Sequence, residues 1–278
     1  MESFESEVNE FLGGLVVSSP EQVEDEQAVQ RTAEWHEKRR GKTTGSKFKA
    51  LMATKSKATK ANPKSWGSKF WLLDFGDGAL TYIKELAYER GSGNCIIIPD
   101  IFAFRWGREN EPLAKAACET ILGVEIKEVE FLEFQKNAGA SPDGSFILEG
   151  KTFGAEFKCP STVASHYNLG MEPVVEGHDY FWQVTGEMLA LKTDSLLFAT
   201  FHKDYPEAAR LKHQWVKLSE VHAFALRFRC YVANLIIDQV IKSNYSLDIR
   251  AAIDLIGEDV PEGINDISDW LNERLEVC

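Results

Sequence analysis

Hydrophobic and polar residues alternate along several short stretches of the chain, and a period of two is typical of β-strands with one buried face. Residues 124–134, VEIKEVEFLEF, alternate in this way and predict a half-buried strand. Two further strands are expected within residues 140–160, and two more over SLLFATFH (195–202) and RLKHQWVKL (210–218). The middle and later parts of the chain therefore predict a β-sheet.

Hydrophobic residues that recur every three or four positions predict helices before, between and after these strands. Helices are expected over residues 69–90, 109–122, 180–192 and 220–242. The third of these is mostly hydrophobic, which indicates burial, and the last is long and amphipathic. This order of helices and strands predicts an α/β fold with a central mixed sheet flanked by helices.

The region before residue 69 contains signals for helix starts and stops. Residues 19–22, Ser-Pro-Glu-Gln, have the form of a capping box with proline in the first turn. The predicted helix runs to about Arg39, and Gly41 ends it. The lysine-rich segment 53–69 is polar and predicts a mobile loop. A helix between these two features is expected to be capped by Thr43, Thr44 or Ser46.

Charge is distributed unevenly along a chain whose net charge is −12. Residues 1–30 hold eight acidic side chains and no basic ones, and residues 251–278 hold eight acidic side chains and one arginine. Residues 31–69 hold twelve lysines and arginines against two glutamates. Affinity for phosphates depends on local cationic density, so this basic segment allows a nucleic-acid partner. Taken alone, it is more simply interpreted as a solvated loop.

Length and composition predict one large soluble domain. The 278 residues, 44% of them hydrophobic, can bury a substantial core, and no hydrophobic run reaches the ~20 residues of a membrane helix. The five cysteines are scattered without a CxxC pair, and the acidic start lacks the basic region of a signal peptide; both indicate a cytoplasmic protein with no membrane contact. We expect an acidic appendage over residues 1–30, one domain over 31–245 and an acidic tail over 246–278.

Three charged groups lie close together in the sequence ASPDGSFILEGKTFGAEFKCP, residues 140–160. Because side chains alternate along a strand, Glu156 and Lys158 project from one face while the aromatic residues between them enter the core. Asp143 lies in a Pro-Asp-Gly turn and can fold over the charged face if the two strands form a hairpin. Gly154 on the same face leaves room for a close approach.

Two carboxylates and a backbone carbonyl form a site of hard oxygen ligands, which suits Mg²⁺ or Mn²⁺. A lysine beside them can orient or deprotonate an attacking water and offset charge that builds up on a phosphate. A Glu-x-Lys sequence alone is a weak signal and is more simply interpreted as a solvated pair on a surface hairpin. An aspartate about a dozen residues before Glu-x-Lys on a strand is a more specific signature of a nuclease.

Further motifs accompany this core in a fixed order within residues 33–192, namely EWHEKRRGKTTGS (34–46), WGRENEPLAKAACETILG (106–123), SPDG (141–144), EFKCP (156–160) and YFWQVTGEM (180–188). Together they resemble the lambda-exonuclease-like, or YqaJ-type, viral recombinase nucleases. This family belongs to the PD-(D/E)xK superfamily, so the resemblance implies a restriction-endonuclease-like core.

The resemblance also implies roles for individual residues near the carboxylates. Asp143 and Glu156 would be ligands of Mg²⁺, together with the backbone carbonyl of Phe157, and Mn²⁺ would substitute. Lys158 would be the catalytic lysine. Glu111 would be a catalytic acidic residue that serves the metal site directly or through water, although its place in the first turn of a predicted helix also suits simple dipole compensation.

Other residues of the motifs would contact DNA. Gln183 would act as a catalytic residue at the scissile phosphate. Arg39 and Ser46, with Ser141, would bind the 5′-phosphate of a DNA end, because a guanidinium offers a planar fork of donors and a helix start adds free N–H groups.

The function implied by the resemblance is that of a Mg²⁺-dependent 5′-to-3′ exodeoxyribonuclease acting on double-stranded DNA ends. It would leave 3′ single strands for phage-type homologous recombination, act as a homotrimer around the duplex and work with a single-strand annealing protein. Two alternatives stay open: an endonuclease of the same fold that acts in restriction or repair, and a DNA-end-binding protein without catalytic activity.

Overall fold

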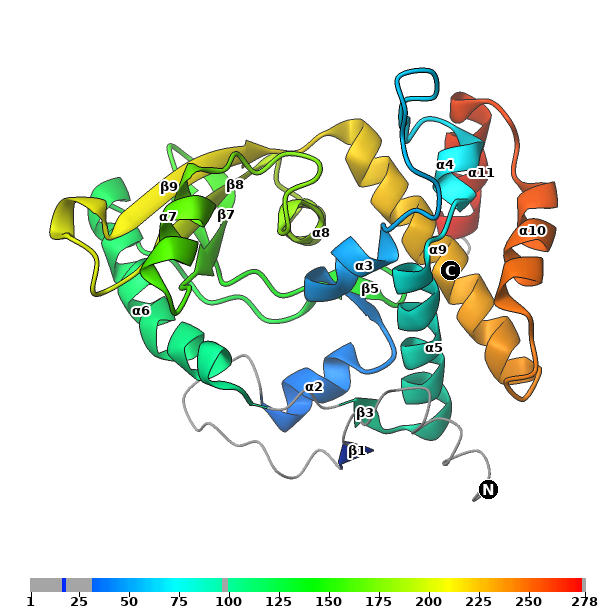
Figure 1. Ribbon diagram of the computed structural model, residues 1–278, viewed down its shortest axis with the longest axis horizontal. Coiled ribbons are helices and arrows are strands. Elements are labelled where there is room, and N and C mark those ends of the chain that lie inside the picture. Colours follow the sequence, from blue (N-terminus) through cyan, green and yellow to red (C-terminus); the bar gives the residue numbers. More distant parts are fainter. Residues whose placement is uncertain (1–16, 19–31, 97–99, 277–278) are drawn as a thin grey trace.

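The computed structural model describes residues 17–18, 32–96 and 100–276, which form an α/β fold with helices on both faces of a mixed sheet (Figure 1). The predicted fold class is therefore confirmed. In the part of the chain that the structure describes, no helix is both long and apolar enough to cross a bilayer. The predicted helix start at residues 19–22 lies outside the described residues.

The main sheet consists of four strands in the order β6-β7-β8-β9, and all four were predicted. β6 pairs antiparallel with β7, β7 runs parallel to β8, and β8 pairs antiparallel with β9. Glu149 and Gly150 join β6 to β7, and both have positive φ, as a two-residue hairpin turn of type I′ requires. The bounds are Gly144–Leu148 for β6, Lys151–Lys158 for β7, Ser195–Phe201 for β8 and Leu211–Lys217 for β9.

Side-chain alternation along β7 and β8 separates two layers of the core. Ala155 and Phe157 pack with residues of α6 (Phe102–Leu122) on one face. On the other face lies α8 (Phe181–Leu191), where a Cβ added to Gly154 would come 2.7 Å from Leu191 Cδ1. The close approach expected at this glycine is therefore made by a helix. α7 (Val163–Met171), which was not predicted, contacts β8 and β9.

A smaller sheet joins the N-terminal region to the turn before β6. In this sheet β2 (Thr43–Thr44) runs parallel to β5 (Ala138–Ala140), and β4 (Leu132–Gln135) pairs antiparallel with β5. The strand predicted over 124–134 is wrong for most of its length, since residues before Leu132 form only one bridge, from Lys127 to Ser145. Alternation there reflects which side chains are buried, and pairing with the neighbouring strand β6 is limited to this one bridge.

α2 (Ala33–Arg39) begins where Thr32 accepts a hydrogen bond from the Trp35 N–H. The prediction of one helix extending from residue 20 to Arg39 is wrong, because Thr32 has an extended backbone and caps a new helix. The predicted end at Gly41 is confirmed by its φ of +67°. Thr44 then precedes the short helix η2 (Gly45–Lys47), which continues into α3 (Phe48–Leu51).

The helix predicted over 69–90 is divided into α4 (Lys69–Leu73) and α5 (Asp77–Ser92). Between them a Cβ at Gly76 would lie 2.8 Å from the Thr54 carbonyl carbon, so the chain bends where it packs closely on this backbone. After α5 comes β3 (Cys95–Ile96), which pairs antiparallel with β1 (Val17–Ser18) in a two-stranded ribbon.

The lysine-rich segment 53–69 contains no strand beyond a bridge at Thr54, and helix begins in it only at Lys69. Arg229, which is fully buried, donates to the carbonyls of Leu51, Ala53 and Leu72 on the two sides of this segment. A buried guanidinium therefore ties both ends of the loop to the core.

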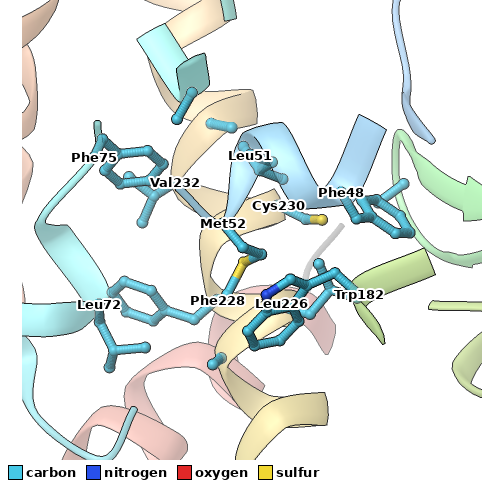
Figure 2. Packing of buried hydrophobic residues seen from close by; sticks show 14 of the residues in the cluster. Phe48, Leu51, Met52, Leu72, Phe75, Trp182, Leu226, Phe228, Cys230 and Val232 are labelled. Carbon is cyan, nitrogen blue, oxygen red and sulfur yellow. The ribbon is translucent and has the colours of Figure 1, made fainter. Parts of the chain in front are cut away.

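α9 (Glu220–Lys242) spans the predicted range and runs through the larger core. Figure 2 shows its side chains, including Leu226 and Phe228, together with Phe48 of α3 and Trp182 of α8. The segment expected to trail as an acidic tail instead forms α10 (Ile249–Asp259) and α11 (Ile264–Glu276), whose apolar faces join this core. Its high charge concealed the helical spacing of its hydrophobic residues. A short helix, η3 (Glu207–Ala209), lies between β8 and β9.

Candidate active site at the β6–β7 hairpin and helix α8

The three charged residues of the hairpin converge, as predicted. Lys158 Nζ lies 2.5 Å from Glu156 Oε1, and Glu156 is completely buried. Asp143 Oδ2 accepts a hydrogen bond of 2.7 Å from the Phe157 N–H. Because Gly144 pairs with Ala155 in the ladder, the hairpin register places Asp143 across from Glu156. The Lys158 ammonium also lies 4.6 Å from the centroid of the Tyr180 ring.

Helix α8 supplies the next contacts to this group. Gln183 Nε2 donates to Glu156 Oε1 at 2.6 Å and to Glu187 Oε1 at 2.8 Å. Glu187 is 1% exposed. It was not among the predicted site residues, and the only signal for it was its place four residues after Gln183 on a buried helix.

Burial and mutual repulsion shift the titration of these carboxyls. Burial raises the pKa of Glu156 to about 8, and the charge of Glu187 adds to the increase. Burial, with the charge of Asp143, raises the pKa of Glu187 to about 7. Burial, followed by the charges of Glu156 and Glu111, raises the pKa of Asp143 well above its ordinary value. The site therefore brings together more carboxyl groups than can easily be ionised at the same time.

The lysine responds in the opposite direction. Burial alone would lower the pKa of Lys158, but the charges of Glu156 and Asp143 outweigh burial and raise it. Lys158 consequently keeps its proton at neutral pH. Glu111, on α6, is half-buried and near enough for its charge to act on Asp143, as the predicted acidic helix residue should be.

The donor set fits a hard divalent cation. Glu156 Oε2 and Glu187 Oε2 are buried oxygens without a hydrogen-bond partner, a costly state for a carboxylate unless a proton or a cation accompanies it. Across residues 17–18, 32–96 and 100–276, no three Asp, Glu, His or Cys side chains are grouped as a ready metal site. The predicted ligand set needs only two such side chains, Asp143 and Glu156, together with the Phe157 carbonyl.

Two of the three predicted phosphate-binding residues are in direct contact. Arg39 Nη1 donates to Ser141 Oγ at 3.2 Å, and Trp35 Nε1 donates to the same oxygen at 3.1 Å. The Arg39 guanidinium stacks 4.0 Å from the centroid of the Trp35 ring. Burial lowers the pKa of Arg39 to about 10, so it stays charged at neutral pH. Only Pro142 separates Ser141 from Asp143, so the arginine cluster adjoins the carboxylates.

Ser46 is exposed in η2. Its neighbour Gly45 is close to both parts of the site, because a Cβ added there would lie 3.4 Å from Ala140 Cβ and 3.7 Å from Gln183 Cγ. A groove of about 440 Å³ lies elsewhere, between residues 173–176 and β9, and none of the predicted site residues lines it.

The fold places this chain in a class with solved exonucleases. LHK-Exo, an alkaline exonuclease from Laribacter hongkongensis, is 21% identical over 77% of this chain and 96% of its own, with a TM-score of 0.61. Its complex with dAMP gives 22% identity, the same coverage and a TM-score of 0.62. A phage-related exonuclease from Haemophilus somnus 129PT is 15% identical over 73% of this chain and 96% of its own, with a TM-score of 0.57. These similarities establish the fold.

The family follows from the sequence itself. The family model of the YqaJ-like viral recombinase domain matches residues 34–194, which is more than half of the chain. The chain therefore belongs to the YqaJ-like viral recombinase domain family, and the resemblance drawn from its motifs is confirmed. No curated protein sequence matches it significantly.

Proposed function

We propose that this protein is a Mg²⁺-dependent exodeoxyribonuclease that degrades linear double-stranded DNA from a 5′-phosphorylated end and leaves a 3′ single strand. One observation carries the proposal: the buried carboxylate–lysine group adjoins an arginine–serine cluster with only Pro142 between them. Such an arrangement suits hydrolysis of the phosphodiester next to a bound terminal phosphate. Family membership and the fold shared with exonucleases support it.

Asp143, Glu156 and the Phe157 carbonyl would hold the cation. When bound, Mg²⁺ would stabilise charge on the phosphate oxygens as a Lewis acid. The Asp143 carboxylate already accepts the Phe157 N–H, which fixes its position beside the catalytic strand. Glu156 is held from two sides by Lys158 and Gln183, so its second oxygen is left for another partner.

Lys158 acts as a charged donor in this proposal. The charges of Glu156 and Asp143 raise the pKa of Lys158, which favours the protonated ammonium as a donor. Its N–H groups can orient the attacking water and stabilise charge on the phosphate. The Tyr180 ring, whose centroid lies 4.6 Å from the ammonium, limits the directions in which the side chain can point.

Arg39 recognises the end of the strand. A terminal phosphate carries more charge than an internal one, and a guanidinium can bind it through two parallel hydrogen bonds. Stacking on Trp35 and the bond to Ser141 hold the guanidinium plane in place before DNA arrives. Ser46, at the start of the adjacent short helix, would add its hydroxyl.

The biological setting is also part of the proposal. The 3′ single strand would serve phage-type homologous recombination in the cytoplasm, with a single-strand annealing protein as partner. A homotrimer around the duplex would keep the enzyme on its substrate. Size measurement in solution by light scattering tests the trimer, and a monomeric protein with full processivity would contradict it.

Digestion of defined substrates tests the activity. Linear duplexes with 5′-phosphate or 5′-hydroxyl ends and a closed circular duplex are incubated with Mg²⁺ or with chelator. We expect each strand of the phosphorylated duplex to be shortened from its 5′ end. Duplexes with 5′-hydroxyl ends should react more slowly, and no duplex should react in chelator. Cleavage of the circle would show an endonuclease instead, and end binding without any product would show a catalytically silent protein.

A further inference from the structure

We propose that Glu187 is a positioning residue that fixes the orientation of the Gln183 amide at the active site. This inference rests on the proposed nuclease function and assigns a role to a buried carboxylate outside the predicted catalytic set. It begins from the contacts of one nitrogen: Gln183 Nε2 lies 2.6 Å from Glu156 Oε1 and 2.8 Å from Glu187 Oε1.

An amide nitrogen carries two hydrogens, and here each has a carboxylate oxygen to accept it. When both carboxylates are ionised, the reverse orientation would place the amide oxygen against two carboxylate oxygens, which repel it. Gln183 is therefore left with only its carbonyl oxygen to offer outward, as an acceptor. An acceptor at this place can bind a water proton or a cation, whereas a donor could bind a phosphate or water oxygen but not a cation.

Glu156 alone would not determine this orientation. Its Oε1 is already shared with Lys158, which lies 2.5 Å away and competes for the same lone pairs. Glu187 supplies the second acceptor from the next turn of the same helix, at the spacing that brings side chains face to face. Glu187 thus adds the constraint that the hairpin cannot provide.

Helix α8 holds Glu187 rigidly. Residues on both sides of it are buried, and a Cβ added to Gly186 would overlap the Phe48 ring of α3. This close packing fixes the rotation of α8 against the core. A carboxylate whose second oxygen has no partner would otherwise turn toward solvent, but Glu187 is 1% exposed.

Two substitutions separate the contribution of the acceptor from that of the charge. Glu187→Met removes the acceptor at similar size, and Glu187→Gln keeps an oxygen that can accept but removes the charge. We expect Glu187→Met to lower kcat on phosphorylated linear duplex roughly tenfold to hundredfold, because one charge-assisted hydrogen bond is lost, with KM for DNA unchanged. Glu187→Gln should keep most of the wild-type kcat, because its amide oxygen can still accept the hydrogen bond. Glu176→Gln is the matched control and should keep full activity, because Glu176 bonds Trp66 and His222 and lines the separate groove.

A double-mutant cycle shows whether Glu187 acts through Gln183. If it does, Gln183→Met with Glu187→Met has the same kcat as Gln183→Met alone, since the amide to be oriented is absent. The inference would be overturned if the double variant lowered kcat by the product of the two single reductions. A wild-type kcat in Glu187→Met would also overturn it.

A readout without activity separates this inference from the proposed function. In full-length protein labelled with ¹⁵N-glutamine, the side-chain amide protons of Gln183, assigned from their loss in Gln183→Met, should lie downfield. Glu187→Met should move one of them upfield, and Glu187→Gln should move it less. Unchanged signals in either variant would overturn the inference, and Glu187→Gln alone decides if Glu187→Met does not fold. Downfield signals in a wild-type protein without nuclease activity would instead refute the proposed function.

Discussion

The Glu187→Gln substitution should change how the stability of the metal-free protein depends on pH. Burial, with the charge of Asp143, raises the pKa of Glu187 from 4.5 to about 7. The folded protein therefore keeps a proton that the unfolded chain releases, and wild-type stability should fall as pH rises from about 4.5 to about 7. Glutamine has no proton to exchange, so the variant lacks this part of the loss.

The size of the effect follows from the shift. A change of 2.5 pKa units (7 minus 4.5) corresponds to roughly 3 kcal/mol at about 1.4 kcal/mol per unit. Relative to wild type, Glu187→Gln should therefore gain about 3 kcal/mol of unfolding free energy between acid and neutral pH, which is on the order of 5–10 °C in Tm.

Urea unfolding in chelator at a series of pH values from 4.5 to 8.5 measures this difference. Glu176→Gln is the control with the opposite sign, because the His222 ring bonds Glu176 and lowers its pKa. That variant should lose stability at neutral pH and approach wild type in acid. Parallel stability curves for wild type and Glu187→Gln from pH 4.5 to 7 would refute the reasoning.

Three further outcomes are expected. Lys158→Ala should lower kcat by about 10²-fold or more by removing a charged donor, while gel-shift binding of DNA ends persists; weakened binding with unchanged kcat would contradict this. Arg39→Ala should abolish the rate difference between 5′-phosphate and 5′-hydroxyl ends; a preserved preference would place the phosphate site elsewhere. Gly186→Ala should destabilise the fold by about 1–3 kcal/mol in urea unfolding, because its methyl overlaps the Phe48 ring; wild-type stability would show that α8 can shift.

The hydrophobic pattern of the sequence predicted an element correctly where that pattern depended on the burial of one face of that element. The helix over 220–242 and the strands around β8 and β9 were predicted because burial of one face imposes a period on the sequence. The prediction over 124–134 failed because a strand needs a continuous ladder of pairs, whereas before Leu132 only Lys127 pairs, with Ser145 of β6, and alternation cannot report this. The acidic C-terminal helices were missed because their exposed faces dominate the charge count.

The reactive group was predictable for a related reason. A two-residue turn links β6 to β7, so the register that sets Asp143 across from Glu156 is decided within fifteen residues of chain. Glu156 and Lys158 share a strand face by alternation alone. These relations depend on backbone geometry between near neighbours, and the sequence contains all of it.

Sequence alone determined the family, the helical and strand character of most elements and the meeting of Asp143, Glu156 and Lys158. Only the tertiary structure decided that Arg39 bonds Ser141, 102 residues away, and that Gln183 lies between two buried carboxylates. The physical reason is that these contacts depend on how α2 and α8 are rotated and seated. That rotation results from close packing against distant residues, such as Gly186 on Phe48, which no local period of the sequence encodes.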